Sequence, residues 1–386
     1  MINIINPEEC SGCSACAAVC PHNAIKMLPD ALGFLYPKVE YEKCVECGLC
    51  EKVCSFNADY DKSINLEIPD SYAVRHKNLK EVETSRSGAA FIAISDYVLD
   101  QGGVVYGAGY TESFRVVHKR AATKKERDEF KGSKYVQSDI NGVFRQVKND
   151  LKRGILVLFT GTPCQTSGLR SYIGTKYVEN LLLVDIVCHG VPAPFIWRDY
   201  KTFLERKVGR KIIKVDFRNK QIFGWTAHKE YFCFHNGTKM IRDSFTYLFY
   251  KHIMLRHSCK VCYYCNTIRP SDMTLADFWG WEKVSLSLNS DDKGVSLVFV
   301  NTEKGRIIFE KVRESIKYCK VKIEDCLQTN LRHPTKINPN RYIFERDYET
   351  KGFNYILTKY GNVGWRYRLK RLLGIMKRRI NSILGF

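Results

Sequence analysis

Eight cysteines near the N-terminus repeat one spacing, C-x2-C-x2-C-x3-C, and thiolates at this spacing are iron ligands. The first run is followed by Pro21, and the second run begins 34 residues later, at position 44 instead of position 10, and is followed by Ser55. The runs are Cys10, Cys13, Cys16, Cys20 and Cys44, Cys47, Cys50, Cys54. A four-iron cluster needs four thiolates around one small inorganic core, of which one tight loop supplies three. The sequence therefore predicts 4Fe–4S clusters and one-electron transfer.

The repeat has the spacing of two-cluster bacterial ferredoxins, in which the fourth cysteine of each run binds the other cluster. We therefore predict a first cluster site made of Cys10, Cys13, Cys16 and Cys54. The second cluster site is then made of Cys44, Cys47, Cys50 and Cys20. Structural zinc sites instead use C-x2-C pairs separated by longer gaps. Ser55 in place of the usual proline predicts a slightly different second loop with the same number of ligands.

A third triple, Cys259-x2-Cys262-x2-Cys265, has no fourth cysteine close behind it. Three thiolates on one loop need a ligand from elsewhere in the fold, and the remaining cysteines are the candidates: Cys188, Cys164, Cys233, Cys319 and Cys326. We predict Cys188, with Cys164 as the alternative, because both follow apolar strands. The prediction is a third 4Fe–4S cluster, and a zinc site or a degenerate site are the other interpretations.

The composition narrows the class of protein. A chain of 386 residues with 45% hydrophobic residues and no apolar run of membrane-spanning length predicts two or three globular domains. Sixteen cysteines without a recognisable secretion signal favour a reducing cytoplasm. The net charge of +20 predicts acidic partners, such as an acidic electron-carrier protein or an anionic membrane surface.

Apolar strands alternate with helices in the middle of the chain. Residues 155–159 and 181–187 form continuous apolar runs, each followed by a cysteine-bearing loop and a helix. Such runs indicate a parallel sheet, in which ligands bind at the carboxyl ends of the strands. We also expect a helix over 85–103 and a hairpin at Asn236-Gly237. The predicted fold is thus an α+β ferredoxin domain fused to an α/β domain with a mostly parallel central sheet.

A series of short motifs resembles the coenzyme F420 hydrogenase/dehydrogenase beta-subunit family. The pieces lie in order within about residues 70–310: Ser87-Gly88-Ala89, Gly132–Tyr135, Thr160–Gln165, Cys188–Pro192, Phe217–Lys220, Gly224-Trp225, Cys259–Cys265, Ser271–Gly280 and Gly294–Gly305. Ala89 stands where that family usually has glycine. The resemblance implies an FAD, a nearby 4Fe–4S cluster, and hydride exchange with a deazaflavin or another organic acceptor. It also allows a surface-polysaccharide-pathway intermediate as the acceptor.

The resemblance suggests roles for individual residues. We expect flavin contacts from Ser87, Gly88, Lys134, Thr162 and Gln165. His189 is the candidate for proton handling, or else a simple hydrogen-bond partner. The resemblance and the motifs divide the chain into 1–58, a dicluster ferredoxin domain; 71–153 and 154–345, the N-terminal and C-terminal regions of the beta-subunit module; and 362–386, a tail.

The tail predicts a basic amphipathic helix. Residues 362–386 contain seven Lys or Arg residues and no acid, with apolar residues at helical spacing and Trp365 at one end. This pattern favours an anionic membrane surface, with docking on the protein itself or on a partner as the alternative; nucleic acid is not expected. We expect a cytoplasmic oxidoreductase, peripheral on the inner face of the membrane, that acts on a small organic substrate. The alternative is a non-catalytic electron-relay subunit.

Overall fold

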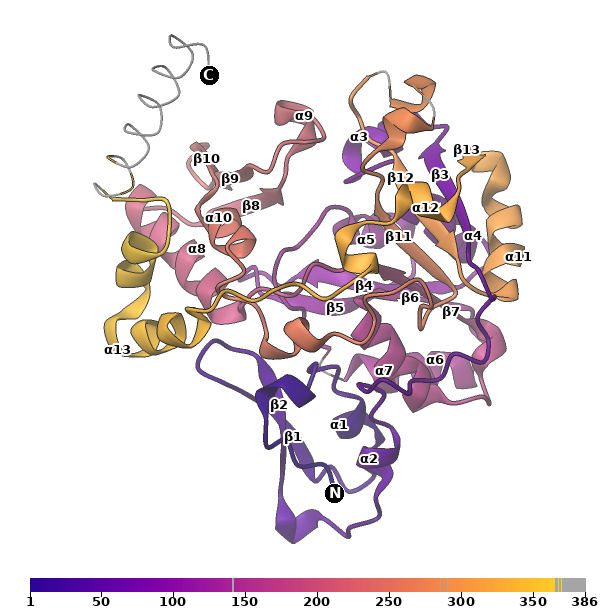
Figure 1. Ribbon diagram of the computed structural model, residues 1–386, viewed down its shortest axis with the longest axis horizontal. Coiled ribbons are helices and arrows are strands. Elements are labelled where there is room, and N and C mark those ends of the chain that lie inside the picture. The colour runs from indigo at the N-terminus through magenta and orange to yellow at the C-terminus, as the bar shows by residue number, and fades with distance from the viewer. Residues whose placement is uncertain (141, 285, 290, 365–366, 368, 370–386) are drawn as a thin grey trace.

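The computed structural model describes residues 1–386 except 141, 285, 290, 365–366, 368 and 370–386. Eight strands of the described part form one large sheet: β3 (Asp70–His76), β4 (Val104–Tyr110), β5 (Val116–Ala121), β6 (Val157–Gly161), β7 (Leu181–Ile186), β11 (Met273–Asp277), β12 (Ser296–Val300) and β13 (Ile316–Lys320). Their order across the sheet is β13-β3-β12-β11-β7-β6-β4-β5. Figure 1 shows this sheet with its helices as the body of the molecule.

The centre of the sheet is parallel and its edges are antiparallel. Strands β11, β7, β6 and β4 run in the same direction, whereas β12, β3 and β13 pair antiparallel on one side and β5 pairs antiparallel with β4 on the other. The five residues between β4 and β5 allow a direct hairpin, which only antiparallel strands can use. The predicted parallel core is confirmed, and the sheet as a whole is mixed.

The central strands are buried on both faces, as their continuous apolar sequences require. In β6, Val157 and Phe159 face a core that also holds residues of α6 (Val143–Lys152) and α7 (Pro163–Ile173). Leu158, between them, faces the opposite core with residues of α4 (Ala90–Asp100) and α11 (Glu303–Val312). This alternation, repeated in β4 and β7, gives a three-layer α/β/α arrangement with a distinct helix pair on each face.

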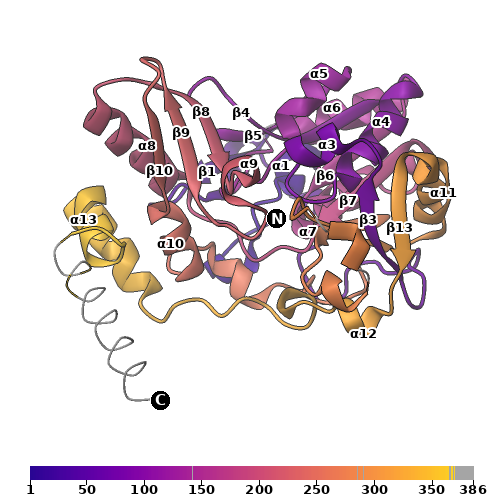
Figure 2. The same cartoon turned by 90° about the horizontal axis from the view of Figure 1, so that it is seen from above.

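A second, smaller sheet lies beside the first, as Figure 2 shows from above. It contains β8 (Ile212–Phe217), β9 (Glu230–Phe234) and β10 (Lys239–Arg242), and it is flanked by α8 (Pro194–Val208), α10 (Ser244–Tyr250) and α13 (Arg341–Lys359). Its core is rich in aromatic rings, with Trp197 packed against Phe217 and Phe245. Gly237, at φ 80°, turns the chain between β9 and β10, which confirms the predicted hairpin.

The cysteine-rich N-terminal unit projects from the sheet domain on the side of α6 and α7 (Figure 1). It contains α1 (Ala15–Val19), β1 (Ile25–Pro29), β2 (Leu35–Val39) and α2 (Leu49–Lys52), with β1 and β2 paired as a hairpin. Gly168 of α7 lies against it: a Cβ there would lie 2.8 Å from the Sγ atom of Cys13. Arg145 of α6 donates hydrogen bonds to the carbonyl oxygens of Ala17, Ala18 and Cys20. The unit is therefore held against α6 and α7 by the hydrogen bonds of the Arg145 side chain and by the packing of Cys13 on Gly168.

The helix predicted over 85–103 is shorter in the structure, since α4 begins at Ala90. The residues before α4 form a loop that follows the short helix α3 (Leu79–Thr84). The other short helices are α5 (Lys124–Arg127), α9 (Lys220–Phe223) and α12 (Ile323–Cys326). Ala89 caps α4 in the left-handed region, with φ 65°. The predicted boundary between regions 71–153 and 154–345 divides the strands of one sheet, because β4 lies before it and its neighbour β6 lies after it.

No helix in the described part of the chain is long and apolar enough to cross a membrane. The basic amphipathic helix predicted for the tail falls mainly on 365–366, 368 and 370–386, which lie outside the described residues.

Candidate functional site

The second cluster site surrounds a partly open cavity. Cys20, which follows α1, lines it together with Cys44, Cys47 and Cys50 from the second run. Cys50 is buried and Cys47 is exposed. The cavity thus brings together the crossed set of thiols that the ferredoxin spacing predicts. Their role as iron ligands stays a prediction, and the set fits a 4Fe–4S cluster in number and type of donor.

The first cluster site is more deeply enclosed. Burial is the main cause that raises the pKa of Cys13 to about 12, and the neighbouring Cys54 and Cys10 raise it further. Burial also raises the pKa of Cys16, with added repulsion from Cys13, Cys10 and Cys54. These four thiols therefore lie close enough to repel one another as anions, and metal ions are the usual means of holding such a group deprotonated. The set again joins Cys54 to the first run.

Five thiols meet at the third site, which the parallel core creates. Strands β6 and β7 are adjacent and parallel, so the loops after them lie at one sheet edge. Cys164, in the first turn of α7, and Cys188, in the loop after β7, thus meet Cys259, Cys262 and Cys265: burial, then repulsion from Cys259, Cys164 and Cys262, raises the pKa of Cys188. The Val191 N–H donates to the Sγ atom of Cys259 at 3.4 Å. Both predicted candidates for a fourth ligand are thus beside the triple.

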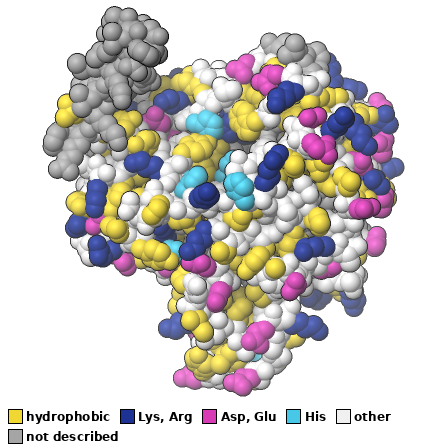
Figure 3. Space-filling view, in the orientation of Figure 1, with side chains coloured by type: hydrophobic (Ala, Val, Ile, Leu, Met, Phe, Trp, Pro, Cys, Tyr) yellow, Lys and Arg dark blue, Asp and Glu magenta, His cyan; other side chains and the backbone are white. Residues whose placement is uncertain are grey.

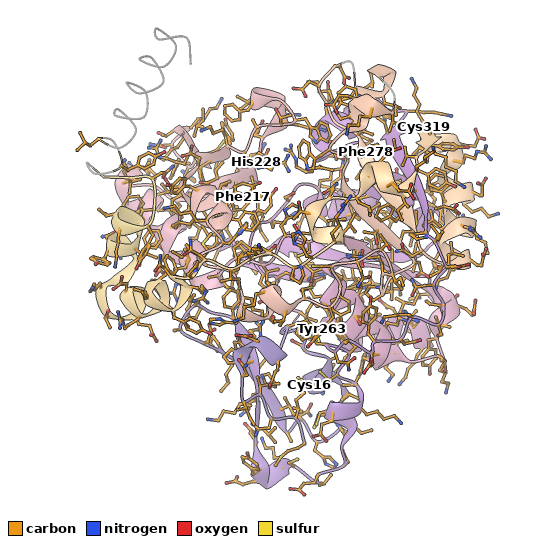
Figure 4. All side chains as sticks on the ribbon, viewed as in Figure 1. Cys16, Phe217, His228, Tyr263, Phe278 and Cys319 are labelled. Atoms are coloured by element: carbon orange, nitrogen blue, oxygen red, sulfur yellow. The ribbon has the colours of Figure 1, made fainter. Side chains whose placement is uncertain are left out.

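The other candidates for a fourth ligand lie elsewhere in the fold. Cys233 is on β9, Cys319 is on β13, and Cys326 is on α12 in a separate apolar cluster. Figure 4 shows Cys319 at a distance from the N-terminal Cys16 and from Tyr263 of the third-site loop. Among the described residues, no three His, Cys, Asp or Glu side chains are arranged around a single metal ion. A four-iron cluster spreads its four ligands over a larger core than one ion does.

An aromatic cluster joins the first and third sites. Tyr264, which lies between Cys262 and Cys265, packs with Phe56 and Tyr60 against side chains of both sites, Cys54 on one side and Cys164 and Cys262 on the other. The Tyr264 hydroxyl donates to the Ser55 carbonyl oxygen at 2.7 Å. This residue therefore connects the third-site loop with the residue that replaces the expected proline. The three thiol sites form a series that ends at the sheet edge.

Two residues predicted to contact a flavin instead shape the loop after β6. The side-chain oxygen of Gln165 accepts hydrogen bonds from the Thr162 N–H at 3.0 Å and the Thr162 hydroxyl at 3.1 Å. Its nitrogen donates to Ser138 Oγ at 3.0 Å, and only 2% of Gln165 is exposed. Thr162 and Gln165 form a capping box that starts α7 and fixes the Cys164 loop. Gln165 therefore has a positioning role in the structure, and its contact with a flavin stays a prediction.

Lys134, Ser87 and Gly88 are also engaged within the protein. The Lys134 ammonium donates to the carbonyl oxygens of Glu129 and Lys131 at 2.7 and 3.0 Å. The Ser87 hydroxyl donates to the Val295 carbonyl oxygen at 2.6 Å. A Cβ on Gly88 would lie 2.2 Å from a backbone oxygen of β3, so this glycine permits close packing of backbone. The flavin contacts of Lys134, Ser87 and Gly88 stay predictions.

A cationic group lies between the two sheets, next to the third site. Arg218, at the end of β8, pairs with Asp277, at the end of β11, with an N–O distance of 2.7 Å. Arg86 donates to the carbonyl oxygens of Arg218 and Trp225. Within the described residues the Nε atoms of both arginines are buried without a hydrogen-bond partner. We refer to Arg86, Arg218 and Lys220 as the cationic group.

Further side chains complete this region. Burial mainly lowers the pKa of His189, and Asp277 opposes that effect while His252 and Arg218 add to it. His189 directly follows Cys188 of the third site and interacts electrostatically with the Arg218–Asp277 pair. Figure 4 labels Phe217, His228 and Phe278, and Figure 3 shows histidines with Lys and Arg near the middle of the same face.

Two tryptophans provide an aromatic surface. Trp225 is buried and stacks on Trp279, with ring centroids 4.7 Å apart and an angle of 16°. Trp279 is 37% exposed and lies 5.4 Å from the Arg218 guanidinium. Arg86, Lys220, Trp279 and Asp277 were not predicted as site residues, although three of them lie in motifs of the family series. Two buried guanidinium Nε donors without a hydrogen-bond partner among the described residues, together with a conjugated ring surface, fit a planar cofactor that carries phosphates, such as FAD.

Comparisons with known proteins agree with this organisation. Residues 155–325 match the family model for the C terminus of the coenzyme F420 hydrogenase/dehydrogenase beta subunit. Residues 9–58 match the model for a 4Fe-4S dicluster domain. These matches confirm the resemblance for both parts of the chain.

A chain in a xenon-derivatised structure of the F420-reducing NiFe hydrogenase complex from Methanosarcina barkeri is 16% identical, with a TM-score of 0.44, over 74% of this chain and 89% of that chain. No match was found among curated proteins.

Proposed function

We propose that this protein is an iron–sulfur flavoprotein oxidoreductase that exchanges electrons between an acidic carrier protein and a small organic molecule. The observation that carries the proposal is the continuous order of sites: the second cluster site, the first cluster site, the aromatic cluster of Tyr264, the third site and then the cationic group. A match to a family of hydrogenase and dehydrogenase beta subunits supports the same reaction class.

FAD, when bound, supplies the conversion between one-electron and two-electron transfer that an iron–sulfur chain lacks. In our proposal Arg86 and Arg218 bind its phosphates, since their free Nε donors and surplus charge suit an anion. The exposed ring of Trp279 provides a surface for stacking. His189 holds a proton near the acceptor, next to Asp277. The acceptor is a deazaflavin or a polysaccharide-pathway intermediate.

Anaerobic reconstitution tests this function. The purified chain is loaded with iron, sulfide and FAD, reduced with dithionite and mixed with candidate acceptors, and flavin and cluster absorbance are followed separately. We expect about one FAD per chain and reoxidation by an organic acceptor. Arg218→Gln should lose FAD and keep its iron, whereas Arg242→Gln, a half-buried position on β10 of the same small sheet, should keep both. A chain that binds iron but no flavin would be the electron-relay subunit instead.

A further inference from the structure

An arginine of the sheet domain reaches into the N-terminal unit. Arg256 follows α10 and is 1% exposed. Its guanidinium donates to the Cys10 carbonyl oxygen at 2.8 Å and to the Leu35 carbonyl oxygen at 2.9 Å. It also lies 3.6 Å from the Sγ atom of Cys10, within hydrogen-bond distance for sulfur. Cys10 belongs to the first cluster site, so this side chain touches a predicted iron ligand.

The sequence around Arg256 is arranged to admit the guanidinium. A Cβ on Gly12 would lie 2.7 Å from one of its nitrogens, so a larger residue in the first cysteine loop would displace it. Gln137 accepts a hydrogen bond from Arg256 at 3.0 Å and donates to the Ser11 carbonyl oxygen at 2.9 Å. The ring of Tyr36 lies 4.2 Å from the guanidinium carbon. These contacts fix the charge in one position against the first loop.

Arg256 forms no ion pair within the described residues, and its charge acts on Asp30 only at longer range, partly opposing the rise that burial causes in the pKa of that carboxyl. Its contacts are carbonyl oxygens, an amide oxygen, aromatic rings and sulfur, and it is absent from the ion pairs of that part of the chain. Arg269, buried near the third site, is by contrast paired with Asp185 at 3.2 Å. A buried charge is normally balanced by an opposite charge. The thiolates of a bound first cluster would supply that negative charge.

We propose that Arg256 is a positioning residue that raises the reduction potential of the first cluster relative to the second. Reduction adds one electron, and hence one negative charge, which a buried cation and an N–H donor to sulfur stabilise. The second cluster site is open around the exposed Cys47 and is screened by water. The first cluster would then hold the electron between donor and third site. This inference rests on the dicluster domain and is independent of the flavin.

Potentiometric titration followed by electron paramagnetic resonance tests the proposal on the full chain. The first-cluster signal is identified as the one that survives in both Cys47→Ser and Cys262→Ser. In Arg256→Gln we expect the equilibrium constant for reduction of the first cluster to fall on the order of tenfold. For a one-electron couple this makes the reduction potential about 59 mV more negative. Arg256→Lys, which keeps the charge and loses the planar donor, should shift the potential by a smaller amount. The second-cluster potential should stay unchanged.

Arg145→Gln is the matched control. This arginine also crosses from the sheet domain and donates to carbonyl oxygens of the N-terminal unit, but it has no sulfur contact among its hydrogen bonds. It should leave the first-cluster potential unchanged. If Arg256→Gln loses iron, the first-cluster potential measured in Arg256→Lys tests the proposal instead. An unchanged potential in an iron-loaded Arg256 variant, or an equal shift in Arg145→Gln, would reduce Arg256 to an anchor between domains.

Discussion

At the scale of single residues, buried cations placed next to predicted anionic groups are the recurring feature. Arg256 lies at the first cluster site, Arg269 near the third, and the cationic group between the sheets. Lys220 belongs to the last of these: burial chiefly, with the positive charge of Arg86, lowers its pKa to about 7. Its charge is therefore sensitive to pH near neutrality.

This pKa predicts how flavin affinity depends on pH. Lys220 is protonated below about pH 7, and an anionic ligand favours that form, so affinity should fall on the order of tenfold between pH 6 and pH 8. Titration of flavin-free protein with FAD, followed by fluorescence, measures this. Lys220→Met should bind weakly and almost independently of pH, whereas Lys214→Met, an exposed lysine on β8, should behave as wild type. A flat profile in the wild type would exclude Lys220 from the site.

The fourth ligand of the third site is a second question for single residues. Cys188 interacts with all three cysteines of the triple. Repulsion from Cys259 and Cys262 raises its own pKa. The pKa of Cys265 is raised mainly by its hydrogen bond with Cys262, and Cys188 raises it further. Cys164 instead lies 3.2 Å from the Thr162 hydroxyl and also interacts with Cys13. We expect Cys188→Ala to lose about four of about twelve iron atoms and Cys164→Ala to keep them. The measurement is the number of iron atoms per chain in each variant. Loss of iron in Cys164→Ala but not in Cys188→Ala would make Cys164 the fourth ligand.

At the scale of elements, α7 connects the sites. Its first turn fixes Cys164, and one turn later Gly168 lies against Cys13, on the same side of the helix. A glycine inside a helix costs about 1 kcal/mol relative to alanine, so its presence here indicates a close approach. The helix therefore sets the separation between the N-terminal unit and the sheet edge.

Enlarging Gly168 should separate the N-terminal unit from the sheet domain. In Gly168→Val, overpacking against the Cys13 side chain at 2.8 Å should destabilise the protein by about 1–3 kcal/mol, which exceeds what a better helix former gains. The midpoint of thermal unfolding and the rate of trypsin cleavage within 59–69 report the effect. Ser171→Thr, which adds a methyl group elsewhere on α7, should change neither. Unaltered cleavage in Gly168→Val would mean that the contact is not tight.

Sequence reasoning was most successful where chemistry and backbone pattern coincide. The cysteine spacing predicted which thiols meet, and two apolar runs predicted adjacent parallel strands with Cys164 and Cys188 at one edge. It did not reveal Arg86, Arg256 or Trp279, because a single arginine or tryptophan belongs to no repeating pattern from which a partner distant in the sequence could be predicted. The sequence also did not reveal that Gly88 lies against the backbone of β3, because the spacing of a glycine does not show which segment approaches it.

At the scale of the whole molecule, the order of sites runs from the exposed N-terminal unit to the region between the two sheets (Figure 1). The net charge of +20 suits an acidic carrier protein or an anionic surface. The tail contributes seven of these positive charges.

The tail predicts reversible, charge-driven membrane binding. Each basic residue near anionic lipid contributes on the order of 1 kcal/mol, an effect screened beyond about 8 Å at physiological salt. Full-length protein should therefore sediment with anionic vesicles at low salt, and a 1–361 variant should remain in the supernatant. Neutral vesicles are the control. Equal sedimentation of both forms would assign the tail to protein packing.

The close contact of Cys13 with α7 also bears on the order in which the protein is assembled. Gly168 and Arg256 lie against the first cluster site, whose thiols are buried at Cys16 and half-buried at Cys10, Cys13 and Cys54, whereas Cys47 of the second site is exposed. We therefore expect iron to enter the first site more readily before the N-terminal unit docks, and the second site to be filled or repaired afterwards. Damage by oxygen or chelators would follow the reverse order, beginning at the exposed cluster and sparing the enclosed one.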